Sequence, residues 1–318
     1  MQRANKHQFL RKLFLAPGLA FSLSQCAAQQ VLEPVQVLEP ASVHQIPLSQ
    51  GQPILAVKNW PNDDDVVARI HIVTIPPNYP VEVAVGDGLK TVEDFATETK
   101  ALAVLNGGFF DPNNTQTTSF VTVNGTLAAD PRNNARLIDN PDLAIYIEQI
   151  LNRSEFRRYD CVEGVRYDIT VHNAAIPHDC TLHSALGAGP QLLPNDTSQT
   201  EGFTDYVNGT LTRDAIGSQQ QNARSAIGIK EDGTLLWVMV AQPDPTGGMT
   251  LAELAEFMAT MDAQKVLNLD GGSSSSLQIL WSDNNELDRT YYGRLDQNGQ
   301  KIQRPVKSVL FIPKPADR

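Results

Sequence analysis

The chain has few cysteines, a deficit of positive charge and no long apolar run. Of 318 residues, 3 are Cys, and 25 Lys and Arg stand against 36 Asp and Glu, for a formal net charge of -11. This acidic surplus excludes a general nucleic-acid binder, because phosphate backbones attract clusters of Lys and Arg. An apolar stretch near the N-terminus has about 12 residues, too few to span a bilayer as a helix. We therefore expect no nucleic-acid partner and no transmembrane domain beyond a signal.

The N-terminus has the pattern of an export signal. Four Lys and Arg residues in the first 12 positions precede "LFLAPGLAFSLSQCAAQQ", a short apolar segment followed by small residues. Residues 1–28 are predicted to be the signal, with cleavage after Ala28. The alternative is a lipoprotein signal with Cys26 lipidated. Either way the protein is expected to be exported, to the periplasm, the cell envelope or the extracellular space.

The rest of the chain divides into a spacer and one domain. Residues 29–56 are rich in Pro and Gln and repeat "VLEP", which is typical of an extended linker. Residues 57–313 have the composition to bury a sizeable core, and 314–318 form a tail.

Within the domain, short apolar and alternating runs predict mostly strands. The predicted strands are 68–75, 81–86, 101–110, 119–127, 143–150, a hairpin over 224–242 that turns at Asp232-Gly233, a buried strand over 265–270, and 308–312. Helices are predicted at 91–100 and 250–261, the second with Thr250 and Glu253 as a capping box. The pattern between 152 and 217 is less regular, and whether this segment is an insertion or part of the core is left open. The predicted class is α+β, with a large mixed, mostly antiparallel sheet and a few packed helices.

Two cysteines, Cys161 and Cys180, remain in the mature chain. In an oxidising compartment they would form a bridge that closes about 20 residues and stabilises the fold by roughly 3 kcal/mol. The alternative is two unpaired buried thiols.

The stretch "NLDGGSSSS" follows the apolar run at 265–269 and is the first candidate site. Its glycines, Gly271 and Gly272, allow backbone N–H groups to approach an anion closely, and Ser273 and Ser274 add hydroxyl donors. Asp270 beside them would act as an acid, a base, a nucleophile or a metal ligand. The alternative is a tight turn that Asp270 caps, with exposed serines.

A second stretch, "LNGGFFDP", ends another apolar strand in the same manner. Asn106, Gly108 and Asp111 would line one cleft with the Asp270 loop if the two strands are neighbours. Phe109 and Phe110 offer an apolar wall for a sugar face, although core packing is the favoured interpretation for at least one of them.

Two further residues, Gly189 and Arg224, are candidates for the same site. Gly189 lies in "LGAGPQLL", after a short apolar stretch. Arg224 in "NARSAIGI" enters a strand and could hold a phosphate or carboxylate bidentately, or else form a surface ion pair.

Together these motifs resemble the phosphodiester glycosidase family. The segments "NGGFFD", "GAGPQL", "RSAIGI", "GMTLAELAEFM" and "NLDGGSSSSL" occur in that order, and the resemblance covers about 57–313. Ser273 stands where the family commonly has a third glycine, and Arg304 in "RPVKS" only partly matches the closing strand. The family includes bacterial exported proteins linked to exopolysaccharides.

The resemblance implies a hydrolase that cleaves the sugar C1–O bond of sugar-1-phosphodiesters in surface or envelope glycans. Asp270 and Asp111 are the implied catalytic residues. The implied substrate-binding residues are Asn106, Gly108, Gly189, Arg224, Gly271, Gly272, Ser273 and Ser274. The alternative function is a non-catalytic envelope protein that binds cell-wall or exopolysaccharide glycans.

No metal or other cofactor is predicted. His172, His178 and His183 lack the spacing of a helical zinc site, and "DPNNTQTTSFVT" fails as a calcium loop at its glycine and final acid positions. Calcium bound through Asp111 or Asp270 is left open.

Overall fold

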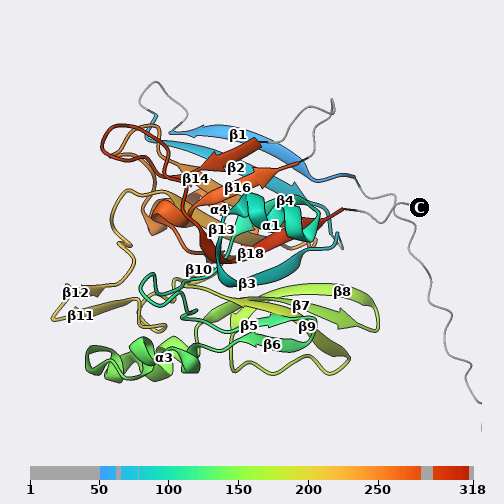
Figure 1. The fold of residues 1–318 in the computed structure, drawn as a ribbon, viewed down its shortest axis with the longest axis horizontal. Coiled ribbons are helices and arrows are strands. Elements are labelled where there is room, and N and C mark those ends of the chain that lie inside the picture. The colour runs from blue at the N-terminus through green and yellow to red at the C-terminus, as the bar shows by residue number, and fades with distance from the viewer. Residues whose placement is uncertain (1–50, 62–65, 78, 281–288, 315–318) are drawn as a thin grey trace, which may run out of the picture. The chain divides into compact units, whose positions relative to one another are not determined.

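The computed structural model describes residues 51–61, 66–77, 79–280 and 289–314 (Figure 1). The predicted export signal, Cys26 and most of the Pro/Gln-rich linker lie outside the described residues. The first strand begins at Ile54, just before the domain start predicted at residue 57.

Most of the described chain is β-strand, arranged in three larger sheets and one ribbon. The first sheet has six strands in the order β1-β2-β14-β13-β15-β10. These strands are β1 (Ile54–Trp60), β2 (Ala68–Ile75), β10 (Gln191–Leu193), β13 (Arg224–Lys230), β14 (Leu235–Ala241) and β15 (Ala263–Asn268). All of its strand pairs are antiparallel.

The second sheet has five strands in the order β17-β16-β4-β18-β3, and the third has five in the order β6-β5-β9-β7-β8. The second contains β3 (Glu82–Lys90), β4 (Ala101–Asn106), β16 (Ser276–Ile279), β17 (Arg289–Tyr292) and β18 (Val306–Pro313). The third contains β5 (Val121–Val123), β6 (Thr126–Ala129), β7 (Ser154–Cys161), β8 (Gly164–Val171) and β9 (Cys180–Gly187). The ribbon pairs β11 (Thr204–Val207) with β12 (Thr210–Asp214).

Two helices with capping boxes cover the first two sheets. In α1 (Val92–Thr99) Thr91 and Asp94 form a capping box that the sequence analysis did not single out. In α4 (Leu251–Ala259) Thr250 and Glu253 form the predicted one. Helix α1 packs on β4 and β18, and α4 on β15 and β10. Shorter helical segments are η1 (Pro131–Asn133), α2 (Ala135–Ile138), η2 (Pro141–Tyr146), α3 (Ile147–Leu151) and η3 (Gly272–Ser274). No helix in the described ranges is long and apolar enough to cross a membrane.

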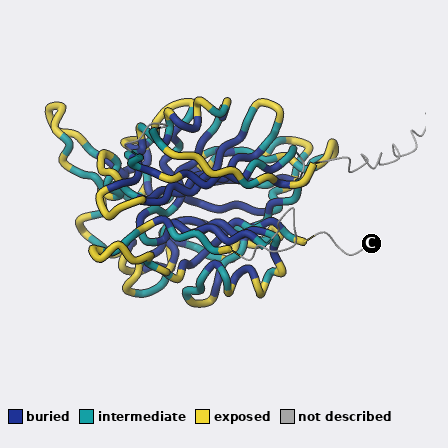
Figure 2. Tube along the Cα trace, turned by 90° about the horizontal axis from the view of Figure 1, so that it is seen from above, coloured by how far each residue is buried: buried dark blue, intermediate teal, exposed yellow. Residues whose placement is uncertain are grey.

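The main core lies where the three larger sheets face one another. It combines Trp237 of the first sheet, Leu105 of the second and Phe156 of the third, all fully buried. Figure 2 shows this as a dark band of buried backbone with exposed loops around it. The predicted class, α+β with mostly antiparallel strands and a few helices, is confirmed; the strands divide among several antiparallel sheets instead of forming one mixed sheet.

One predicted strand, 143–150, is wrong. The segment is helical, because Pro141 favours the start of a helix and the Asn140 side chain accepts the Asp142 N–H at 3.0 Å. Ile145 is 79% exposed, so its apolar side chain does not enter a sheet face. The alternation of apolar residues here reflects no strand pairing.

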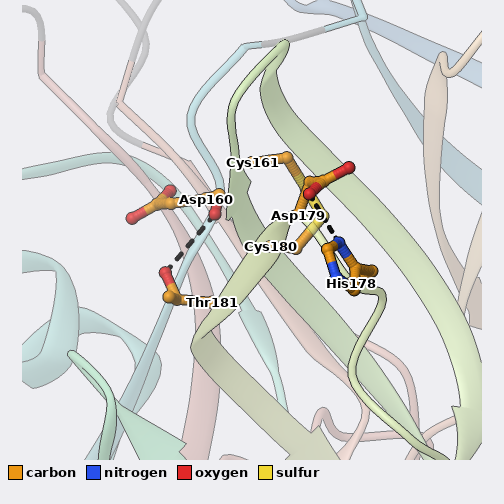
Figure 3. The surroundings of a disulfide bond; sticks show 6 residues. All are labelled: Asp160, Cys161, His178, Asp179, Cys180 and Thr181. Carbon is orange, nitrogen blue, oxygen red and sulfur yellow. Dashed lines mark hydrogen bonds and ion pairs between the residues drawn. A yellow bond between two sulfur atoms is a disulfide. The ribbon is translucent and has the colours of Figure 1, made fainter. Parts of the chain in front are cut away.

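The segment left open, 152–217, contains β7 to β12 and a disulfide. Cys161 and Cys180 are directly opposed across β7 and β9, with their Cα atoms 4.0 Å apart, and the predicted bridge is present (Figure 3). Beside it, the Thr181 hydroxyl donates to the carbonyl oxygen of Asp160 at 3.3 Å. The bridge therefore links β7 to β9 covalently at one end of the third sheet.

Candidate functional site

Two strands from different sheets end side by side at the site. The Asp270 N–H, just after β15, donates to the carbonyl oxygen of Gly107, just after β4, at 3.0 Å. The Asn106 side chain donates to the carbonyl oxygen of Asp270 at 2.7 Å. The structure thus brings together the two Gly-Gly segments that the sequence singled out.

Asn106 is completely buried and joins three segments. Its Oδ1 atom accepts the Ser225 hydroxyl at 2.7 Å and the Ser276 N–H at 3.1 Å, while its Nδ2 atom holds Asp270. Because the side chain of Asn106 uses these atoms for protein partners, its role in the structure is to position the loop of Asp270. The prediction that it binds substrate stays a prediction.

A cleft of about 220 Å³ opens above these strand ends. Its lining is mainly polar and includes backbone and side chains from four distant segments of the chain. The lining residues are Phe109, Ala215, Ile216, Asn222, Arg224, Asn268, Asp270, Gly271, Gly272, Ser273, Arg294 and Arg304.

Asp270 is the acidic residue of this lining, and its carboxyl group has an unusual environment. Burial raises the pKa of the Asp270 carboxyl from 3.8 to about 6. The Ser274 hydroxyl, the positive charge of Arg304 and the Gly271 N–H favour the charged form and limit that rise. The Ser274 Oγ atom is itself fully buried, and its geometry falls short of a complete hydrogen bond. A carboxyl group with a pKa near neutrality is suited to proton transfer.

Two arginines from the C-terminal part of the chain face the same cleft. Arg304 donates from Nη1 to the Ser273 hydroxyl at 2.9 Å, and its guanidinium lies 5.0 Å from the centre of the Phe110 ring. Arg294 is exposed and forms no ion pair with any residue that the structure describes. The cleft therefore carries positive charge near the Asp270 carboxylate.

Arg224 lines the cleft but uses most of its donors elsewhere. Only 2% of it is exposed, and its guanidinium donates to four carbonyl oxygens: those of Met249 (2.9 Å), Ile216 (3.1 Å), Gly217 (2.6 Å) and Gln220 (2.8 Å). Burial lowers the pKa of Arg224 to about 10, against the opposing effect of the Asp214 charge. Arg224 thus fastens the 216–220 loop, which supplies one wall of the cleft, and its predicted contact with phosphate remains untested.

The Gly-Ser loop forms the short helix η3. Ser273, which stands where the family commonly has glycine, takes a backbone conformation that any residue can adopt, because it is not among the residues with positive φ. Gly271 and Gly272 bring their backbone to the cleft surface, and Ser273 points its hydroxyl at Arg304. Ser274 lies beneath, beside the Asp270 carboxyl.

Gly108 and Gly189 support the site without lining the cleft. A Cβ atom at Gly108 would lie 2.1 Å from the carbonyl oxygen of Gly187, so only glycine fits there. Gly189 has φ of +111° and exchanges two hydrogen bonds with Asn268: its N–H donates to the Asn268 carbonyl at 3.0 Å, and its own carbonyl accepts Asn268 Nδ2 at 2.9 Å. Gly108 thus permits close approach to Gly187, and Gly189 permits close approach to Asn268, two residues before Asp270.

Asp111, the other predicted catalytic residue, forms an ion pair of its own. Its carboxylate accepts Arg136 Nε at 2.7 Å and the Asn113 N–H at 2.8 Å. The pKa of its carboxyl is lowered, since the N–H of Asn113 and the charge of Arg136 outweigh its partial burial. Asp111 does not line the cleft, and its catalytic role stays a prediction.

Two of the histidines considered in the sequence, His172 and His183, contact carboxylates. His172 Nδ1 lies 3.0 Å from Glu155 Oε2, and His183 Nδ1 lies 2.9 Å from Asp160 Oδ2. Across the described ranges, no group of three or more His, Cys, Asp or Glu residues has the arrangement of a metal site.

Sequence reasoning missed Asn222, Asn268, Arg294 and the Ala215-Ile216 wall. Asn222 lies two residues before Arg224, and Asn268 lies two residues before Asp270. Both could therefore have been predicted as site residues from their position beside the motifs. Arg294 follows β17 in a polar segment without a motif, and no pattern in the sequence singles it out.

Asp270 with its raised pKa, Arg294, Arg304 and glycine-rich backbone share one polar cleft, a composition that suits an anionic ligand. The chain belongs to the phosphodiester glycosidase family, whose model matches residues 99–312. It is 21% identical over 225 residues to the mouse (Mus musculus) N-acetylglucosamine-1-phosphodiester alpha-N-acetylglucosaminidase. That match covers 71% of this chain and 40% of the mouse protein's length.

Solved structures share the fold. The catalytic domain of the zebrafish N-acetylglucosamine-1-phosphodiester alpha-N-acetylglucosaminidase, auto-inhibited by its pro-peptide, matches with a TM-score of 0.56 at 18% identity, covering 83% of each chain. A putative exported protein from Burkholderia pseudomallei K96243 matches with a TM-score of 0.50 at 17% identity, over 77% of this chain and 74% of the other.

Proposed function

We propose that the protein is an exported hydrolase that cleaves the sugar C1–O bond of sugar-1-phosphodiesters in surface or envelope glycans. The observation that carries this proposal is Asp270, a carboxyl group with a raised pKa in one cleft with Arg294 and Arg304. Membership of the phosphodiester glycosidase family supports the reaction class.

The chemistry of the leaving group explains this composition. Cleavage of the C1–O bond releases a phosphomonoester, which is a weak base and needs stabilisation of negative charge more than a proton. Two arginines and the Ser273 hydroxyl offer such stabilisation. Ordinary glycosidases flank the bond with two carboxyl groups, of which one protonates the leaving oxygen. Among the described residues that line this cleft, Asp270 supplies the one carboxyl group, as expected for a leaving group that needs little protonation.

In this mechanism Asp270 acts in its charged form. It either takes a proton from the attacking water or attacks the anomeric carbon itself, and both roles require a carboxylate. With a pKa of about 6, most of the protein carries that carboxylate at neutral pH. Phe109 and Ile216 give the cleft an apolar portion suited to a sugar face.

Two features support export. The N-terminal residues have the charge and apolar pattern of a secretion signal. The Cys161–Cys180 bridge is of the kind that persists in oxidising compartments. Envelope or extracellular glycans are the substrates that an exported hydrolase of this family would meet.

The test is to incubate the purified full chain with a panel of sugar-1-phosphodiesters and to measure free sugar and phosphomonoester together. We expect both products in equal amounts, and none from the Asp270→Asn variant. A folded wild-type protein that releases neither product across the panel would contradict the proposal and favour the alternative, a non-catalytic protein that binds envelope glycans.

A further inference from the structure

The loop glycine Gly272 lies between two polar side chains that face the cleft. A Cβ atom at this position would lie 3.3 Å from Arg294 Nη1, 3.6 Å from Asn222 Nδ2 and 3.7 Å from Asn222 Oδ1. The guanidinium and the amide therefore converge on the space beside Gly272 that a side chain would otherwise fill. Its φ of +60° also favours glycine.

The amide of Asn222 has a fixed orientation. Its Oδ1 atom accepts the Ala223 N–H at 2.9 Å, which leaves the Nδ2 group as the free end. Within the part of the chain that the structure describes, this Nδ2 group has no hydrogen-bond acceptor, although Asn222 lines the cleft. It is a donor that points at the cleft with both protons unused.

The backbone of Asn222 is held firmly. Its N–H donates to the Met249 carbonyl at 3.3 Å, and its carbonyl accepts the Met249 N–H at 2.9 Å. The preceding 216–220 loop is fastened by Arg224. A donor fixed in this way loses little conformational entropy when it binds a ligand.

Arg294 supplies the second donor and the charge. It is exposed, lines the cleft and makes no ion pair among the described residues, so its charge is available to a ligand. A neutral amide and a planar guanidinium on either side of one point suit two oxygens of a tetrahedral oxyanion.

We propose that Asn222 and Arg294 form an oxyanion-binding pair over Gly272 that takes the non-bridging oxygens of the substrate's phosphoryl group. This inference rests on the proposed function, and it adds which residues hold the phosphoryl group. Arg304, bonded to Ser273, then lies next to Asp270 and modulates the charge of its carboxyl group.

Calorimetric titration of the full chain with inorganic phosphate tests the pair. In Asn222→Asp the new carboxylate still accepts the Ala223 N–H but replaces the donor with negative charge, whereas Asn222→Ala removes both. We expect about tenfold weaker phosphate binding in Asn222→Ala, a larger loss in Asn222→Asp, and about tenfold weaker binding in Arg294→Gln. If Asn222 had only a structural role, the order would reverse, with Asn222→Asp close to wild type.

Arg166→Gln is the matched control. Arg166 is exposed on β8 and does not line the cleft, so this variant removes the same charge from another face. It should bind phosphate as wild type does, and so exclude a simple effect of net charge. Equal losses in Arg166→Gln and Arg294→Gln, or a wild type that binds no phosphate at millimolar concentration, would overturn the pair.

The outcomes separate this inference from the function. A wild type that hydrolyses phosphodiesters while Asn222→Asp keeps its KM and its phosphate affinity refutes the pair and leaves the function intact. A wild type that binds phosphate through the pair but hydrolyses no diester refutes the function and leaves the pair.

Discussion

The side chain of Asn106 donates a hydrogen bond of 2.7 Å to the main-chain carbonyl of Asp270, which is 164 residues further along the chain. This contact joins the end of β4 in one sheet to the end of β15 in another. The position of the Asp270 carboxyl therefore depends on how two sheets meet and not on its own loop alone.

Replacing Asn106 with Ala should weaken both the fold and the site. It leaves the Ser225 hydroxyl, the Ser276 N–H and the Asp270 carbonyl without their partner, and unsatisfied buried groups cost about 1–3 kcal/mol each before relaxation. We expect a loss of about 3 kcal/mol in the free energy of unfolding, measured by denaturant titration. Asn298→Ala, at an exposed turn, should stay within about 0.5 kcal/mol of wild type. A loss no larger than this for Asn106→Ala would contradict the assigned role.

Replacing Asp270 with Asn should abolish turnover while stabilising the protein at neutral pH. The folded-state pKa of Asp270, about 6, lies above its ordinary value of 3.8. Above pH 6 the folded protein therefore bears the full cost of a buried charge, and below about pH 4 both states are protonated and the cost is absent. Thermal unfolding should show a higher Tm for Asp270→Asn than for wild type at pH 7, and a smaller difference at pH 4. A lower Tm for the variant at pH 7 would show that the carboxylate stabilises the fold.

The pH dependence of activity should report the same group. If Asp270 acts as a carboxylate, kcat/KM rises with pH to a plateau, with a midpoint near pH 6 in the free protein. The charge of Arg304 lowers the pKa of this carboxyl, so Arg304→Gln should move the midpoint to higher pH. The measurement is kcat/KM from pH 4 to pH 9 for both proteins, with Arg166→Gln as a control of unchanged midpoint. A midpoint that stays fixed or falls in Arg304→Gln would contradict this coupling.

Local signals in the sequence predicted several residues that the structure places in the cleft lining, Arg224, Asp270, Gly271, Gly272 and Ser273. That the two Gly-Gly segments share a cleft was predicted only on the condition that their strands are neighbours, and the contact of Asp270 with Gly107 meets that condition. The Thr250–Glu253 capping box identified α4. The helix at 141–151 was missed, because its alternating apolar residues imitate a strand, whereas Pro141 and the Asn140 cap determine the backbone.

What the sequence could not give is the contact between distant segments. Arg294 and Asn222 lie 72 positions apart and meet only through the fold around Gly272. The motif around Arg224 suggested that this residue belongs to the site. No local pattern, however, indicated that its guanidinium donates to three carbonyl oxygens of the 216–220 loop and to that of Met249. Likewise, Asp111 and Asp270 each stand near a Gly-Gly pair in the sequence. The structure nevertheless pairs the Asp111 carboxylate with Arg136.

The Cys161–Cys180 bridge should matter for stability and not for activity. It closes a sequence separation of 19 residues, and neither cysteine lines the cleft. A Cys161→Ser, Cys180→Ser double variant should lose about 3 kcal/mol in the free energy of unfolding while keeping its kcat/KM at 25 °C. Wild type under reducing conditions should match the double variant. A loss of activity in a fully folded double variant would link the third sheet to the site.

Variants of Arg224 can show whether this residue acts by holding the 216–220 loop in place or by supplying positive charge to the cleft. Its guanidinium meets carbonyl oxygens in four directions, and a lysine ammonium has the charge without that planar fork of donors. If fastening is its function, Arg224→Lys and Arg224→Ala should both raise KM by a similar factor, of about ten or more, and amides 216–220 should exchange hydrogen faster in both variants. If charge at the cleft is what counts, Lys should keep phosphate affinity and KM near wild type while Ala loses both. Hydrogen exchange of the loop and the KM of the two variants, measured together, decide between these roles, because only fastening predicts a mobile loop in a variant that retains the charge.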